Sequence, residues 1–100
     1  MNLQRKGCKV ITLEDVQYRW KAYSTQKGTE VRAALNEIEG GQILVAQVPK
    51  LFNLKWVIPI IEFGLENGWK SNEEGKPYYI RKNRETYRVL DADECPPPRS

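Results

Sequence analysis

The side chains that carry most enzyme chemistry are absent from this sequence or too few to form a site. The chain has no histidine, which is the usual general base near neutral pH and the commonest metal ligand. Two cysteines, Cys8 and Cys95, are too few for a structural zinc site within one chain. The Gly40-Gly41 pair fits neither a dinucleotide-binding turn nor a phosphate loop. We therefore expect a protein that is not an enzyme and holds no metal or cofactor, although no pattern excludes carboxylate or lysine chemistry.

The two cysteines and the absence of long apolar runs bear on location. A disulfide between Cys8 and Cys95 would tie the ends together, whereas two reduced thiols are the usual state in the cytoplasm. The first apolar run is too short for a signal peptide, and no stretch approaches the ~18 apolar residues of a membrane helix. We expect a cytoplasmic protein with no membrane partner.

A basic, tyrosine-bearing segment near the C-terminus is one candidate site. Arginine and lysine contact phosphates, and exposed tyrosines stack on unpaired bases. The segment suggests weak nucleic-acid binding, and Arg19 and Lys21 could extend it. The alternative is a solvated sheet surface with one tyrosine in the core. The candidate contact residues are Tyr79, Arg81, Lys82, Arg84 and Arg88.

An aromatic stripe on a predicted helix is the other candidate site. Trp56, Ile60 and Phe63 lie nearly opposite the main apolar stripe of that helix. A helix on a sheet needs one apolar side, so a second stripe has to be covered. Either the tail or the last hairpin covers it, or it forms a homodimer or partner interface. The second alternative makes the chain a protein-interaction module; a small-ligand pocket between helix and sheet is a further alternative.

Length and composition predict one domain that positions these residues. The chain has 100 residues, of which 40% are hydrophobic, enough to close a single core. Residues 1–90 are expected to form the domain and residues 91–100 a polar, proline-rich tail. The net charge of +3 reflects a basic excess near both ends, a weak indication of an anionic partner.

A hairpin is predicted over residues 10–23. With Glu14-Asp15 as the loop, Leu13 lies opposite Val16, and the strands acquire one apolar and one wet side. The apolar side then comprises Ile11, Leu13, Val16, Tyr18 and Trp20, and the wet side Thr12, Gln17, Arg19 and Lys21.

Residues 29–40 fit two structures. One is a helix with Thr29 as N-cap that ends at Gly40. The other is a strand that turns at Gly40-Gly41 into a second strand over residues 42–48. Composition does not decide between them.

A helix is predicted over residues 54–67, with Asn53 as N-cap and Gly68 at its end. Pro59 either bends this helix on its polar side or begins it after a short turn. Gly64 lacks a side chain where the helix approaches its sheet. The main apolar stripe comprises Leu54, Val57, Ile58, Ile61 and Leu65.

Two β-like runs, residues 77–82 and 86–90, complete the chain. The order is ββ-ββ-α-ββ. It predicts an α+β fold with a single antiparallel β-sheet, built from hairpins, and one helix packed on one face. Trp20 and Trp69 are expected in the core.

Three pieces of the sequence resemble a known family. The matching residues are Ile11, Thr12, Tyr18, Arg19 and Trp20 at the start, Ile61, Leu65, Gly68 and Trp69 at the helix end, and Gly75 with Tyr78 or Tyr79 after it. This pattern is similar to a family of small uncharacterised bacterial proteins with an ITxDGxxYRW-like start and an AL-x-x-GW helix end. The resemblance implies strands within residues 30–48 and no known activity. The chain departs from the family at Asp15, where the family has a turn glycine, and at Gly64, where it has alanine.

Overall fold

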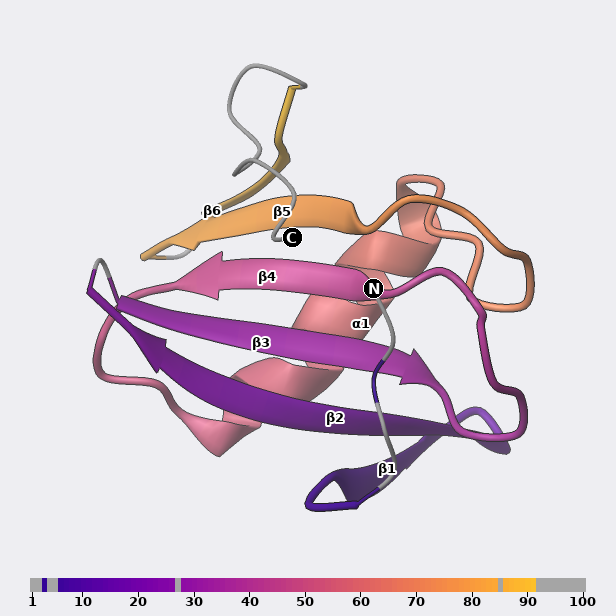
Figure 1. The fold of residues 1–100 in the computed structure, drawn as a ribbon. Coiled ribbons are helices and arrows are strands. Elements are labelled where there is room, and N and C mark those ends of the chain that lie inside the picture. The colour runs from indigo at the N-terminus through magenta and orange to yellow at the C-terminus, as the bar shows by residue number, and fades with distance from the viewer. Residues whose placement is uncertain (1–2, 4–5, 27, 85, 92–100) are drawn as a thin grey trace.

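The computed structural model describes residue 3 and residues 6–26, 28–84 and 86–91. Cys95 and the predicted tail from residue 92 onward lie outside the described residues. Figure 1 shows strands crossed obliquely by one helix. The elements are β1 (Lys9–Leu13), β2 (Val16–Thr25), β3 (Gly28–Leu35), β4 (Leu44–Val48), the 3₁₀ turn η1 (Leu54–Trp56), α1 (Val57–Glu66), β5 (Tyr78–Asn83) and β6 (Thr86–Val89).

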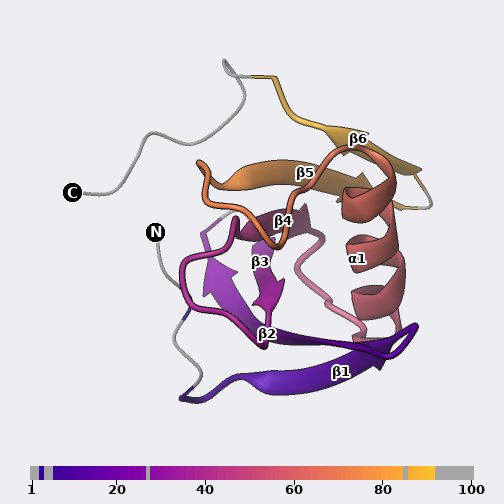
Figure 2. The same ribbon diagram turned by 90° about the vertical axis from the view of Figure 1, so that its right-hand side faces the viewer.

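The strands form one sheet in the order β1-β2-β3-β4-β5-β6, and α1 lies on one side of it (Figure 2). The predicted α+β class, with one helix on one face, is confirmed. The prediction that every pair is antiparallel is wrong for β4 and β5, which pair in parallel and make the sheet mixed. The crossover through α1 returns the chain to the end of the sheet where β4 began, so β5 runs in the same direction as β4.

The first hairpin has the predicted register. Leu13 lies opposite Val16, and Ile11 lies opposite Tyr18. Glu14 and Asp15 have φ angles of 49° and 66°, the two positive values that a tight hairpin turn with the right twist requires. Aspartate tolerates this conformation better than most residues, so Asp15 can replace a turn glycine.

Residues 28–35 are a strand, which settles the helix-or-strand question. β3 pairs with both β2 and β4, so it lies inside the sheet. The connection to β4 runs through residues 36–43 and is longer than the predicted Gly40-Gly41 turn. The Asn36 amide still donates to the Gln17 carbonyl at 2.9 Å, and beyond it the Ile38 carbonyl, like that of Leu35, accepts a hydrogen bond from the Arg19 guanidinium.

The predicted helix consists of η1 followed by α1. The Asn53 carboxamide oxygen accepts from the Lys55 amide at 2.9 Å, as the N-cap prediction requires. Pro59 is the third residue of α1, in the first turn, where a backbone N–H has no acceptor within α1. Gly68, with φ of 109°, follows the helix end.

Two apolar clusters lie on opposite faces of the sheet. The larger lies under α1 and contains Trp20 and Trp69, both buried as predicted. The smaller contains Leu3, Ala34, Ile43 and Val45, with Cys8 and Tyr79 beside it. The face away from α1 is therefore partly covered by Leu3.

Gly64 allows α1 to lie directly on β4. A Cβ at this position would be 3.0 Å from both methyl carbons of Leu44 and 3.2 Å from the Trp69 ring. We expect Gly64→Ala to lower the free energy of unfolding by about 1–2 kcal/mol, because overpacking outweighs the better helix propensity of alanine. Urea unfolding followed by tryptophan fluorescence measures this. Gly75→Ala, in an exposed loop, is the matched control, and a Gly64→Ala protein more stable than wild type would contradict the close approach.

Candidate functional site

Strand alternation divides the predicted basic hairpin between the two faces of the sheet. Lys82 lies on the α1 side and is only 6% exposed. Its ammonium lies 4.3 Å from the ring centroid of Trp56 and 5.5 Å from that of Tyr87. Lys82 is therefore a buried cation between aromatic rings, and it is not placed to contact a phosphate.

The other basic side chains of this region meet cations from distant strands on the face away from α1. Strand pairing sets Lys21 opposite Arg32, and Arg81 opposite Arg88. Arg81 also pairs with Gln47 of β4, so the residues form adjacent rows across β2 to β6. Figure 1 views this face, with α1 behind the strands. We call it the basic face and define it by Lys21, Tyr23, Arg32, Arg81 and Arg88.

Short contacts hold these cations on the sheet. The Arg32 guanidinium carbon lies 4.6 Å from the Tyr23 ring centroid, and the Lys21 ammonium lies 5.4 Å from it. The Arg32 Nε donates to Glu30 at 2.6 Å. Arg81 donates from Nε and Nη2 to the Gln47 side-chain oxygen at 3.1 and 2.8 Å. Cations held in this way lose little conformational freedom when an anion binds.

Arg19 lies on the same face but has a structural role. It is 1% exposed. Its guanidinium donates to the carbonyls of Leu3 at 2.8 Å and Ile38 at 3.1 Å, and to that of Leu35. Lys21 thus extends the basic face as the sequence suggested, and Arg19 does not.

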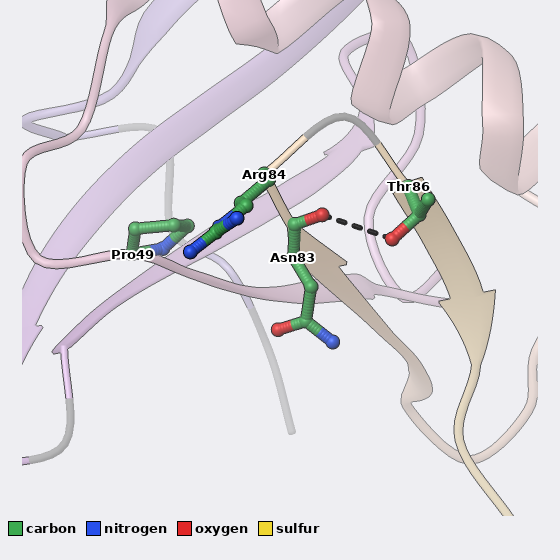
Figure 3. A pocket seen from close by; sticks show the side chains of 4 residues that line it. All are labelled: Pro49, Asn83, Arg84 and Thr86. Atoms are coloured by element: carbon green, nitrogen blue, oxygen red, sulfur yellow. Dashed lines mark hydrogen bonds between the residues drawn. The ribbon is translucent and has the colours of Figure 1, made fainter.

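Arg84 lies at the turn between β5 and β6, beside a shallow hollow. Figure 3 shows its side chain extending toward Pro49, next to Asn83 and Thr86. The Thr86 hydroxyl donates to the Asn83 carbonyl at 2.9 Å and closes this turn. This hollow is at one end of the sheet. The alternative prediction, a small-ligand pocket, concerned the space between helix and sheet, and buried side chains of α1 and β4 fill that space.

Charge is segregated along the strand direction in the described residues. Where β4 and β5 end, the connecting segments carry cations, namely Lys50, Lys55 and Arg84. At the other end, carboxylates outnumber cations: Glu14, Asp15, Glu37, Glu39, Glu66, Glu73 and Glu74 stand against Lys70 and Lys76. A polyanion is therefore attracted to one end of the molecule and repelled by the other.

The predicted aromatic stripe on α1 is covered by the last hairpin. Ile60 is 1% exposed and belongs to the core, which corrects its place in an exposed stripe. Trp56 is half-buried beneath Lys82, and Phe63 stacks on Tyr87 with ring centroids 5.3 Å apart. The three residues are thus packed within the chain, and their role in a partner interface stays a prediction.

Three tyrosines have a raised pKa. Burial raises the pKa of Tyr18, Tyr78 and Tyr87, and the Glu14 carboxylate adds to the effect at Tyr18. All three hydroxyls therefore stay protonated near neutral pH, and Tyr78 donates to the Asn67 carbonyl.

Neither a cluster of metal-ligating side chains nor a membrane-spanning helix occurs among the described residues. No group of three or more metal-ligating His, Cys, Asp or Glu side chains gathers among them. None of their helices has the length and apolar character needed to cross a bilayer. Cys8 is half-buried beside the smaller cluster, and Cys95 lies outside the described residues.

Comparisons with models of known families, with curated proteins and with solved structures find no match to this chain. The resemblance to the family of small bacterial proteins stays a prediction. The fold and the site define an α+β domain with a mixed six-stranded sheet, one helix, and a basic face on the side away from that helix.

Sequence reasoning found part of this face. Tyr79, Arg81 and Arg88 were predicted contacts on β5 and β6, and Tyr79 lies on this face beside the smaller apolar cluster. Tyr23 and Arg32 were missed. The signal for Arg32 was its alternation with the buried Val31 and Ala33, which is visible only when residues 28–35 are read as a strand.

Proposed function

We propose that the protein is a non-enzymatic binding module that holds single-stranded nucleic acid on the basic face. The observation that carries the proposal is the gathering of Lys21, Arg32, Arg81 and Arg88 on one face by strand register. Strand pairing also places Glu30 on this face, where it is bonded to Arg32. A cytoplasmic location, expected from the sequence, fits this proposal.

The shape of the face favours a single strand over a duplex. Four strand spacings separate β2 from β6, a width of about 19 Å. Phosphates can follow the cation rows, while bases stack on Tyr23 or on the guanidinium plane above it. Reading a duplex groove requires a protruding helix or ribbon, and α1 lies on the other side of the sheet (Figure 2).

Salt dependence tests the proposal. Labelled single-stranded RNA and DNA oligonucleotides, and a duplex of the same length, are titrated with the protein between 50 and 200 mM salt and followed by fluorescence anisotropy. Four phosphate contacts predict that log K falls with log salt at a slope of about −3, or about 50-fold over this range. Binding to the single strand should exceed binding to the duplex.

Heparin competition separates charge alone from nucleic-acid recognition. We expect heparin to displace the oligonucleotide less effectively than an unlabelled single strand does, because a sulfated sugar cannot stack on the arginine–tyrosine pair. Absence of binding at 50 mM salt would contradict the proposal. So would a duplex that binds as tightly as the single strand, or heparin that competes as well as the single strand.

A further inference from the structure

A second surface, an apolar strip along α1 and the segment before it, is left exposed by the fold. Leu51, Leu54, Ile58 and Leu65 are 88%, 60%, 39% and 39% exposed. Ile58 and Leu65 lie two helical turns apart, and Leu54 precedes Ile58 by one turn, so the three side chains share one side of the helix. We call Leu54, Ile58 and Leu65 the apolar strip.

The apolar strip lies on the flank of α1 toward β1 and β2. Trp56 and Phe63 lie on the other flank, where they contact Lys82 of β5 and Tyr87 of β6. The strip is about half a turn around the helix from them. Leu13 and Val16, at the end of the first hairpin, are half-buried and pack against the core under α1.

The polar residues bordering the strip change sign along the helix. Lys55 lies at its start, and Glu62 and Glu66 lie in its second half; all three are exposed. When two copies of such a helix pack antiparallel, the lysine of each meets the glutamates of the other, and the helix dipoles also oppose favourably. In a dimer with two-fold symmetry, both copies contribute the same surface, so each lysine–glutamate contact occurs twice.

We propose that α1 forms the two-fold seam of a homodimer, with the apolar strips of two copies packed antiparallel and Lys55 of each copy beside Glu62 and Glu66 of the other. The seam and the basic face lie on opposite sides of the sheet, so a dimer presents two basic faces outward. Two faces on one particle would bind a long single strand more tightly than either alone. The dimer itself does not depend on the proposed nucleic-acid binding.

The solution mass of the full chain, without nucleic acid, tests the seam. Sedimentation equilibrium from micromolar to millimolar protein should give a monomer–dimer equilibrium that stops at the dimer. Ile58→Glu should abolish the dimer and leave the monomer folded, because Ile58 is already partly exposed. Val10→Glu is the matched control: Val10 is 52% exposed and lies on the other face of β1, so this variant should dimerise like wild type.

A charge exchange tests the orientation of the two helices. Lys55→Glu should weaken the dimer about tenfold, because the attractive lysine–glutamate contacts on both sides of the two-fold axis become repulsive. Adding Glu62→Lys and Glu66→Lys to that variant should restore the wild-type dimer constant. A monomer at every concentration, a dimer that survives Ile58→Glu, a mass that grows beyond two copies, or a dimer indifferent to the exchange would each overturn the proposal.

Discussion

Replacing Arg19 with methionine is expected to lower the free energy of unfolding by about 3–5 kcal/mol, the largest loss that we expect from a single substitution on the face away from α1. The Arg19 guanidinium donates to the carbonyls of Leu3, Leu35 and Ile38 from a site that is 1% exposed. Methionine fills similar space but leaves these carbonyls without their donor. Urea unfolding monitored by tryptophan fluorescence measures the change.

Two further variants show whether the hydrogen bonds are responsible. Arg19→Lys retains the charge, but one ammonium cannot reproduce the geometry of the guanidinium fork, so we expect an intermediate loss. Lys21→Met, two residues along the same strand and face, should change stability by less than about 0.5 kcal/mol. Equal stability of Arg19→Met and wild type would show that the three contacts contribute no net free energy.

Local patterns predicted the first hairpin because its determinants are local. Alternation of apolar and polar side chains set the faces, and a two-residue turn set the register. The same alternation placed Arg19 correctly on the face away from the helix but predicted that it would be wet. Arg19 is buried by Leu3 and by the loop after β3, which accept its hydrogen bonds. These segments are distant from β2 in sequence, so the residue pattern of β2 alone does not predict the contacts.

The helix illustrates a second limit. Its apolar residues almost encircle it, so periodicity alone did not show which arc faces the sheet. The structure buries Val57, Ile60 and Ile61 and exposes Ile58, which the sequence had assigned to the core stripe. Ile60, assigned to the interface, is 1% exposed and lies at the edge of the buried arc, on the side nearest Phe63.

The basic face was half-predicted for a similar reason. The cations of β5 and β6 were found together because they are close in sequence. Arg32 lies on the same face as these cations because β3 is a central strand of the sheet. The parallel pairing of β4 with β5 places Arg81 beside Gln47. Strand order across a crossover helix depends on the packing of the whole chain, so the sequence of either segment alone could not reveal this neighbourhood.

Removing two cations from the basic face, as Lys21→Gln with Arg81→Gln, is expected to weaken single-strand binding by about 50-fold at 50 mM salt and about tenfold at 200 mM. Each phosphate contact contributes about −0.7 to the slope of log K against log salt, so the slope should rise from about −3 to about −1.4. Glutamine retains hydrogen-bonding capacity and can still pair with Gln47. Anisotropy titrations of the variant and wild type at both salt concentrations measure the difference.

The matched control removes the same charge from the acidic end. Lys70→Gln with Lys76→Gln gives the same net charge, but both residues are exposed in the connection between α1 and β5, away from the basic face. The proposal depends on where the cations lie and not on the net charge. This control loses no phosphate contact, so it should bind single strands within about twofold of wild type. If both double variants lose affinity equally, the attraction comes from the net charge of the molecule, and the basic face is not the binding site.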